Sequence, residues 1–322
     1  MEAVEFLPVP ARRATLIPHR RLFANLFLLF ITLVWGATFT LTKTALLSVP
    51  VYPLVFTRFF LAAVALVGVS LLSPARRTVW RGRVWGIGTV LGVFLFGAYA
   101  LQTLGLLTVS APAAGFLTGL NVVLVPIFGT LLTRQRGSWR TWLGALLAAA
   151  GLAFLSGPGI WHLQAGDLYI LGCAVCLALQ ILGVDRYTDA VDPIALAAVE
   201  LITVAICALA VSLLWPQGPH AWSLNHWLRP GVVWTVLVNG LLGTSLAYWG
   251  QNICQRFTSA GEIAIIFTME PVFAAAIAWV FVGAALSVAG IIGGVLVVVS
   301  MWVADPSIRP LRLRVNTVAR RN

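Results

Sequence analysis

Apolar residues gather into ten segments of about twenty residues each, separated by short polar links. An α-helix needs about 20 residues, at about 1.5 Å of rise per residue, to cross roughly 30 Å of hydrocarbon. The pattern therefore predicts ten membrane-spanning helices. We place them near residues 23–42, 52–72, 84–104, 111–132, 141–158, 167–185, 193–215, 231–251, 260–282 and 287–304.

The composition excludes a soluble domain. Hydrophobic residues make up 60% of the 322 positions and charged residues only 10%, whereas soluble domains have about a quarter charged. Only two arms, 1–21 and 305–322, extend beyond the apolar region, and the first apolar segment is too long for a cleavable signal. We expect an all-α polytopic membrane protein that retains its first helix.

Basic residues lie almost entirely on one side of the predicted helices. The net charge is +11, and every Lys and Arg except Lys43, Arg58 and Arg229 falls in the arms or in links on the side of the termini. Short cytoplasmic loops carry such an excess because it sets topology. We therefore predict an inner (plasma) membrane protein with both termini cytoplasmic, including a basic tail at 305–322, and no nucleic-acid partner.

An internal repeat divides the chain. Sliding residues 99–151 by 149 positions lays them on 248–300 without a gap, and places spans three to five on spans eight to ten. Among the matched residues are Tyr99 and Tyr248, and Gln102 and Gln251. Because five is odd, two five-helix halves, 22–158 and 159–304, would enter the membrane in opposite orientations, as in many secondary transporters. The alternative is a chance alignment of segments rich in Ala, Leu and Val.

Several motifs resemble those of the EamA-type family of the drug/metabolite transporter superfamily, over nearly the whole of 22–304. The resemblance rests on the order and spacing of Trp35-Gly36-Ala37-Thr38-Phe39, Arg58-Phe59-Phe60, Ala114-Gly115-Phe116-Leu117-Thr118-Gly119-Leu120 with Val125-Pro126, Gly166-Asp167-Leu168, and Met269-Glu270-Pro271-Val272-Phe273-Ala274.

The resemblance implies ten-helix inner-membrane carriers, mostly exporters of amino acids, metabolites or drugs. It also implies a cavity lined chiefly by spans one, three, four, six, eight and nine. This chain departs from the family where a Gly-Glu pair often follows the ninth span, because Gly283 is followed here by Ala284. A role for that acid is in doubt here.

Ionisable residues inside hydrocarbon cost about 2.5–3.5 kcal/mol each on insertion scales, so each one retained needs a reason. Glu270 lies near the middle of the ninth span and precedes Pro271, which leaves the carbonyl of Phe267 without its helical donor. A carboxylate beside a freed carbonyl is a candidate cation or proton site. Pairing with a neighbouring helix is the structural alternative.

Arg58 and Glu200 hold roughly corresponding places in the second and seventh spans. They could face the cavity and bind anionic and cationic groups of a substrate, or form an ion pair that gates or stabilises the bundle. Glu262 lies one turn into the ninth span, where we expect it to interact with the helix dipole.

Polar side chains three residues apart form strips on single helix faces, which in a bundle point inward more readily than to lipid. They could bind substrate or form hydrogen bonds between helices. Trp35 could stack on a substrate or fill the core. The candidate substrate-binding residues are Trp35, Arg58, Tyr99, Gln102, Thr118, Asn121, Gln180, Glu200, Tyr248, Gln251 and Glu270.

Small residues predict close helix packing at Gly115-x-x-x-Gly119 and Gly290-x-x-x-Gly294, which would also suit a homodimer without establishing one. Cys173 and Cys176 are expected to pack as small residues rather than to bind metal. We expect no cofactor.

The main prediction is a secondary transporter that exports a small organic solute and uses a proton gradient or exchange. The sequence has no Gly-x-x-x-x-Gly-Lys phosphate loop. A channel or a scaffold is the alternative. An intramembrane enzyme is less favoured, because there is no His-Glu-x-x-His motif and all four histidines lie in arms or outer links.

Overall fold

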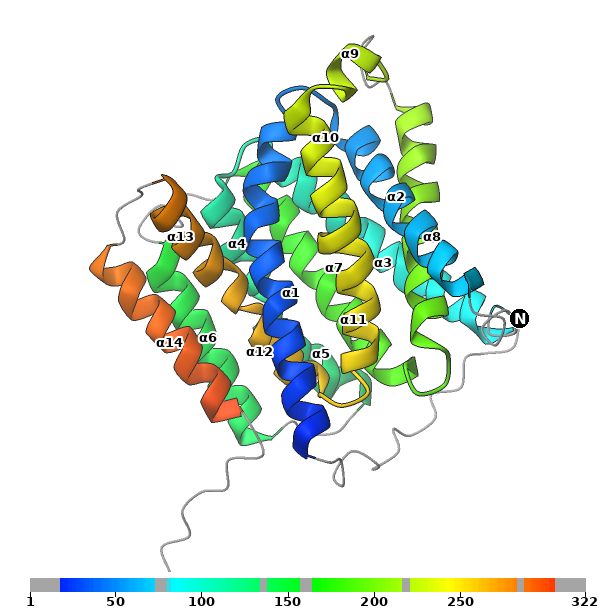
Figure 1. The fold of residues 1–322 in the computed structure, drawn as a ribbon. Coiled ribbons are helices and arrows are strands. Elements are labelled where there is room, and N and C mark those ends of the chain that lie inside the picture. The colour runs from blue at the N-terminus through cyan, green and yellow to red at the C-terminus, as the bar shows by residue number, and fades with distance from the viewer. Residues whose placement is uncertain are drawn as a thin grey trace, which may run out of the picture.

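The computed structural model describes residues 18–72, 80, 82–133, 138–156, 164–215, 221–282 and 287–304. Regular structure in these ranges is helical throughout (Figure 1). The helices are α1 (Pro18–Ala45), α2 (Val51–Leu72), α3 (Arg83–Gly105), α4 (Ala111–Gly119), α5 (Asn121–Thr133), α6 (Trp139–Ser156), α7 (Ala165–Tyr187), α8 (Pro193–Leu214), α9 (Leu224–Trp227), α10 (Pro230–Leu237), the π-helix η4 (Val238–Leu246), α11 (Ala247–Cys254), α12 (Ala260–Phe267), α13 (Met269–Val282) and α14 (Val288–Ala304).

Within the described ranges, eight helical segments are long and apolar enough to cross a membrane, and two more, Trp139–Phe154 and Val288–Ala304, are apolar but shorter. The all-helical membrane architecture is thus confirmed, while the count of ten spans stays a prediction. Large apolar side chains such as Leu72, Leu214 and Trp302 are exposed on the outside of the bundle, where lipid would cover them.

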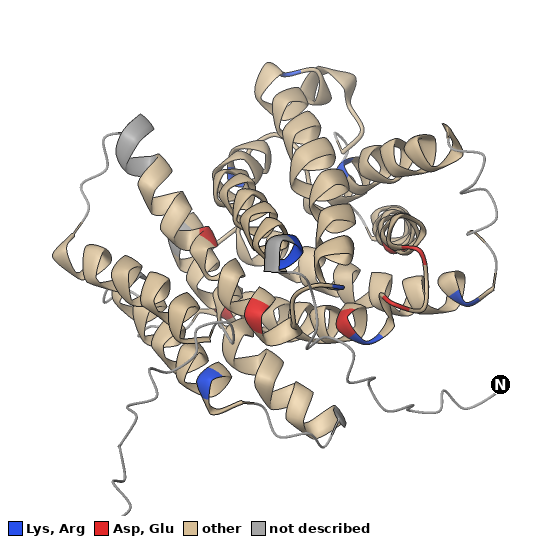
Figure 2. Ribbon diagram, turned by 60° about the horizontal axis from the view of Figure 1, so that its bottom comes forward, with Lys and Arg blue, Asp and Glu red and all other residues tan. Residues whose placement is uncertain are grey.

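Charged residues lie mostly near the helix ends, and long stretches of helix carry none (Figure 2). Arg58 and Glu200 are exceptions that lie inside helices, and Glu270 lies inside the ninth span, in the first turn of α13. Most of both arms, 1–17 and 305–322, and the Gly283-Ala284 departure lie outside the described residues.

Polar residues cap the helices at matching places in the two halves. The side chain of Ser110 accepts a hydrogen bond from the Ala113 amide at the start of α4. Ser259 likewise accepts from the Glu262 amide at the start of α12, and Glu262 completes a capping box. Glu262 also pairs with Arg21, at 2.9 Å. The predicted place of Glu262 at a helix N-terminus is confirmed.

The two halves run in opposite directions. Asn25, near the start of α1, accepts a hydrogen bond from Thr258 at 3.0 Å, and Asp185, near the end of α7, accepts from the amide of Ala260 at 3.2 Å. The first helix of one half therefore begins at the end of the molecule where the first helix of the other half finishes (Figure 1). Helix α2 packs on its counterpart α8, and α6 on α14.

Three of the expected single spans are divided. The fourth breaks at Leu120, between α4 and α5, and the ninth breaks at Thr268, between α12 and α13. The repeat offset of 149 residues brings Leu120 onto Met269, next to Thr268, so the two breaks correspond to within one residue. Pro271 explains the second break, as the sequence predicted, because it cannot donate to the carbonyl of Phe267. The eighth span widens into the π-helix η4.

Close backbone approaches occur at glycines other than those of the two predicted motifs. A Cβ atom at Gly151 of α6 would lie 2.7 Å from the carbonyl oxygen of Gly293 in α14. At Gly115 and Gly294 the nearest atoms, of Pro271 and Val272, would be 3.4 and 3.7 Å away. At Gly119 and Gly290 the nearest atoms belong to side chains, Leu152 Cδ1 at 2.9 Å and Ser287 Oγ at 3.2 Å. The closest approaches to the backbone of another helix therefore occur at other glycines.

We expect Gly151→Ala to lower the thermal stability of the purified protein. Overpacking a tight contact costs about 1–3 kcal/mol, and here the obstructing atom belongs to backbone rather than to a flexible side chain. Gly68→Ala in α2 is the matched control, because nothing lies within 4 Å of its added Cβ. Equal melting temperatures for the two variants in detergent would contradict the proposed α6–α14 contact.

Candidate functional site

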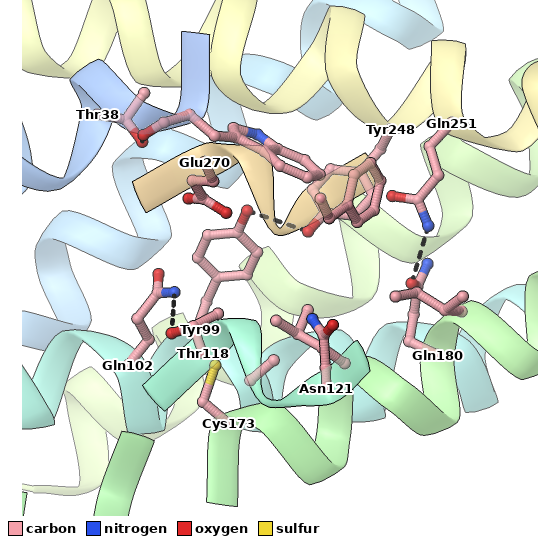
Figure 3. Close-up of a pocket in the computed structure, with 15 residues that line it drawn as sticks. Thr38, Tyr99, Gln102, Thr118, Asn121, Cys173, Gln180, Tyr248, Gln251 and Glu270 are labelled. Carbon is pink, nitrogen blue, oxygen red and sulfur yellow. Dashed lines mark hydrogen bonds between the residues drawn. The ribbon is translucent and has the colours of Figure 1, made fainter. Parts of the chain in front are cut away.

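A cavity lies where the two halves meet, and residues of α1, α3, α4, α5, α7, α11, α12 and α13 line it (Figure 3). These helices are spans one, three, four, six, eight and nine, as the family resemblance implied. The space open to the centre of a water-sized sphere is about 30 Å³, enough for about two water molecules. A larger solute would need the lining helices to separate.

Tyr99 and Tyr248 meet at the centre of the cavity wall (Figure 3). The hydroxyl of Tyr248 donates to that of Tyr99 at 3.0 Å, and the two residues are separated by the repeat offset of 149. The contact therefore joins the same position of both halves and marks the pseudo-two-fold relation between them. Phe59 packs edge-on against Tyr99, with ring centroids 4.8 Å apart.

Arg58 holds this tyrosine and the π-helix together. Its Nε donates to the Thr244 hydroxyl at 2.7 Å, and its Nη2 donates to the carbonyl oxygen of Gly243 at 3.2 Å. The guanidinium also lies 4.6 Å from the centre of the Tyr99 ring. It is buried and has no carboxylate partner among the described residues, so polar acceptors and aromatic faces stabilise its charge.

A smaller second cavity adjoins the first. Arg58 and Tyr99 line it together with Thr42, Thr103 and Asn239. Tyr99 contributes to the walls of both cavities, so its ring separates them. The second cavity lies toward the end of the molecule where α1 finishes and α10 begins.

Trp35 and Gly36 bring α1 against the site. The indole Nε1 of Trp35 donates to the carbonyl oxygen of Gly243 at 2.7 Å, and its ring packs edge-on against Phe267 at 4.8 Å. A Cβ at Gly36 would lie 2.9 Å from the carbonyl oxygen of Glu270. Only glycine lets α1 approach so closely, and Trp35 both fills the core and lines the cavity.

Glu270 and Asn121 face the cavity from corresponding positions, because the same offset of 149 relates them. The carboxyl of Glu270 makes no hydrogen bond with any described residue, and the buried Oδ1 of Asn121 has no partner there either. Both residues flank the broken part of their spans. The cavity thus offers two open acceptors, one of which can carry charge.

Residues of the polar strips line the cavity and also form hydrogen bonds between helices. Gln102 and Gln251 line the cavity, and each also bonds across helices: Gln102 donates to the Thr118 hydroxyl at 3.3 Å, and Gln251 donates to Gln180 Oε1 at 3.1 Å. These bonds fix the orientation of the amides that remain open to the cavity.

Glu200 lies behind Gln180, outside the cavity wall. Gln180 Nε2 donates to one carboxylate oxygen at 2.8 Å, and Asn252 Nδ2 donates to the other at 3.2 Å. Arg58 and Glu200 have separate partners, so the ion pair that the sequence left open is not formed in the described structure.

Nine of the eleven sequence-predicted residues line one cavity, while Arg58 borders the adjoining one and Glu200 is a layer further out. Sequence reasoning missed several lining residues: Thr38, Ala98, Cys173, Leu177, Ile181 and Phe267. Most are apolar and so indistinguishable from core by sequence. Thr38 lies within the Trp35 to Phe39 motif, and that context was the available signal.

Comparison with known proteins agrees with this geometry. A family model described as the EamA-like transporter family matches residues 22–157 and again 164–304. The chain belongs to this family. It is accordingly a multi-pass membrane protein of a transporter family, built from two copies of the family's repeat.

Named relatives are also transporters. An uncharacterized transporter of Archaeoglobus fulgidus is 29% identical over 79% of this chain and 77% of its own length. The uncharacterized transporter YoaV of Bacillus subtilis is 24% identical over 83% and 91%, respectively. A crystallographically solved protein shares the fold, with a TM-score of 0.71 at 23% identity over 88% of this chain and 97% of the other.

We expect Arg58→Lys to destabilise the protein although it keeps the charge. Lysine cannot supply the forked donors that bind Thr244 and Gly243, and each buried acceptor left open costs about 1–3 kcal/mol. Arg83→Lys is the matched control, because Arg83 is exposed at the start of α3. Thermal unfolding followed by circular dichroism should separate the two. Similar melting temperatures for the two variants would show that the two hydrogen bonds of the Arg58 guanidinium do not stabilise the fold.

Proposed function

We propose that this protein is a secondary active transporter that exports a small organic solute, and that the cavity between the two halves is its binding site. The observation that carries the proposal is the pair of open acceptors, Glu270 and Asn121, at corresponding places in a central cavity. A solute with hydrogen-bond donors, such as an amine, suits them. The substrate-binding residues proposed from the sequence are retained here, with Arg58 and Glu200 acting from beside the cavity.

The architecture supports alternating access. Inverted repeats let a midplane site open to either side by exchanging the conformations of the two halves. The broken spans α4–α5 and α12–α13, and the widened η4, are the places where helices of this bundle bend most readily. A cavity of water-molecule size corresponds to a closed stage of such a cycle.

Orientation is proposed from the basic residues. Arg20, Arg21, Arg83, Arg140, Arg186 and Arg256 lie near the end of the bundle where α1 begins, whereas Lys43 and Arg229 lie near the other end. The first end would therefore be cytoplasmic, with both arms on that side of an inner (plasma) membrane. The second cavity, with Arg58, would then lie on the outer path, where its charge would favour anionic groups of a solute.

The carrier is tested in two steps. A thermal-shift screen of metabolites on the purified protein identifies a solute that stabilises the folded state. Uptake of that labelled solute into proteoliposomes should then saturate with concentration and should rise when unlabelled solute is trapped inside. Flux that increases linearly and ignores trapped solute would indicate a channel instead. Protein-free liposomes provide the background.

Coupling is tested at Glu270. We expect Glu270→Gln, which keeps the shape but removes the titratable group, to abolish accumulation driven by a pH gradient and to retain counterflow. Glu262→Gln is the control, because that carboxylate caps α12 and pairs with Arg21 away from the cavity. Accumulation at the wild-type level by Glu270→Gln would exclude Glu270 as the proton-carrying group.

A further inference from the structure

Glu200 is fully buried, and its carboxylate forms no ion pair with any Lys or Arg of the described residues. Its hydrogen bonds in the described structure come from two neutral amides, those of Gln180 on α7 and Asn252 on α11. Tyr248 on α11 is a neighbouring ionisable group, and its hydroxyl bonds to Tyr99 rather than to Glu200. The helices around Glu200 carry other ionisable groups, and none of them forms a hydrogen bond or an ion pair with its carboxyl. These groups are Tyr52 and Arg58 on α2, Arg83 and Tyr99 on α3, Cys207 on α8, Cys254 on α11, and Asp167, Tyr169, Cys173, Cys176, Asp185, Arg186 and Tyr187 on α7.

Asn252 can match either protonation state of this carboxyl. Its Nδ2 donates to Glu200 Oε1, as suits a carboxylate, while its own Oδ1 is buried and has no partner. A rotation of the Asn252 amide by half a turn about its Cβ–Cγ bond exchanges the positions of Nδ2 and Oδ1, and Oδ1 could then accept a hydrogen bond from a protonated Oε1. The rotation breaks only the hydrogen bond that it replaces, because Oδ1 has none to lose.

Hydrogen bonds connect the residues that hold the carboxyl with the cavity wall and with the end of α7. On one side Gln180 connects the carboxyl to Gln251 at the cavity wall. On the other side, the backbone carbonyl of Asn252 accepts a hydrogen bond from the hydroxyl of Thr188, which follows the end of α7, at 2.6 Å. The carbonyl of Thr188 in turn accepts a hydrogen bond from Arg256. Glu200 thus joins α7, α8 and α11 between the cavity and the end of the bundle where α1 begins.

We propose that Glu200 is a second proton-binding site, in which a hydronium ion transfers its proton to Oε1 and leaves as water, and the amide of Asn252 turns so that its Oδ1 accepts a hydrogen bond from the new O–H group. Hydrogen bonds to an ionised acceptor are about twice as strong as those between neutral groups. Proton uptake therefore weakens the hydrogen bonds that hold Gln180 of α7 and Asn252 of α11 to Glu200, and lets these helices separate on the Glu200 side of the cavity. The effect on access rests on the proposed transport function; proton binding at Glu200 does not.

The test is infrared difference spectroscopy of the full-length protein in lipid nanodiscs, comparing high and low pH. We expect acidification to generate a carboxyl C=O band that is absent in Glu200→Gln and present in Glu270→Gln, the matched control. In Asn252→Leu the band should move to higher frequency, because the acid proton loses its acceptor. Gln180→Leu removes the hydrogen-bond donor to the other carboxyl oxygen, Oε2, and should shift the same band independently.

Identical pH-difference spectra for wild type and Glu200→Gln would overturn the proposal. If Glu200→Gln does not fold, an unshifted band in both Asn252→Leu and Gln180→Leu would overturn it equally. An unshifted band in Asn252→Leu alone would overturn the rotating amide. Saturable transport without a Glu200 band refutes this inference and leaves the carrier intact, whereas a Glu200 band without saturable transport refutes the carrier alone.

Discussion

The structure depends on one constraint: a polar side chain inside an apolar bundle must find its partner within the protein, because no water is there to replace it. Arg58 meets this demand with Thr244, Gly243 and the face of Tyr99. Glu200 meets it with two amides. The Arg58 network crosses between the two halves, so satisfying this group also determines how the halves dock, whereas the Glu200 network joins three helices of the second half. In the cavity itself, Glu270 and the Oδ1 of Asn121 have no hydrogen-bond partner among the described residues, and they mark the candidate site.

Symmetry explains where these groups lie, and departures from it explain what they can do. Tyr99 and Tyr248 are the same residue type in both halves and bond directly to each other. Asn121 and Glu270 occupy equivalent places but differ in charge, so at this position only the second half brings a carboxyl group into the cavity. Arg58 and Glu200 are equally far from the starts of α2 and α8 and carry opposite charges. The two ends of the site are therefore electrostatically unlike.

Much of this could be predicted from the sequence, because the relevant signals are local or repeated. Apolar length predicts the helices, and the offset of 149 residues pairs Tyr99 with Tyr248 through residue identity alone. Pro271 predicts the break in the ninth span, since its missing amide hydrogen has a fixed consequence. Ionisable residues in hydrocarbon are rare enough that Arg58, Glu200 and Glu270 stand out.

What could not be predicted depends on contacts between distant segments. Whether Glu200 faces the cavity or lies behind Gln180 is decided by the rotation of α8 about its axis, and an almost uniformly apolar helix carries no pattern that sets this rotation. The same holds for the tight glycine contacts, because Gly36 and Gly151 are distinguished only by the backbone atoms of Glu270 and Gly293 that lie against them. In soluble helices the polar face would reveal the orientation. In a membrane bundle lipid and core are equally apolar, so orientation is determined by small residues and buried polar pairs, which become visible only when the helices are assembled.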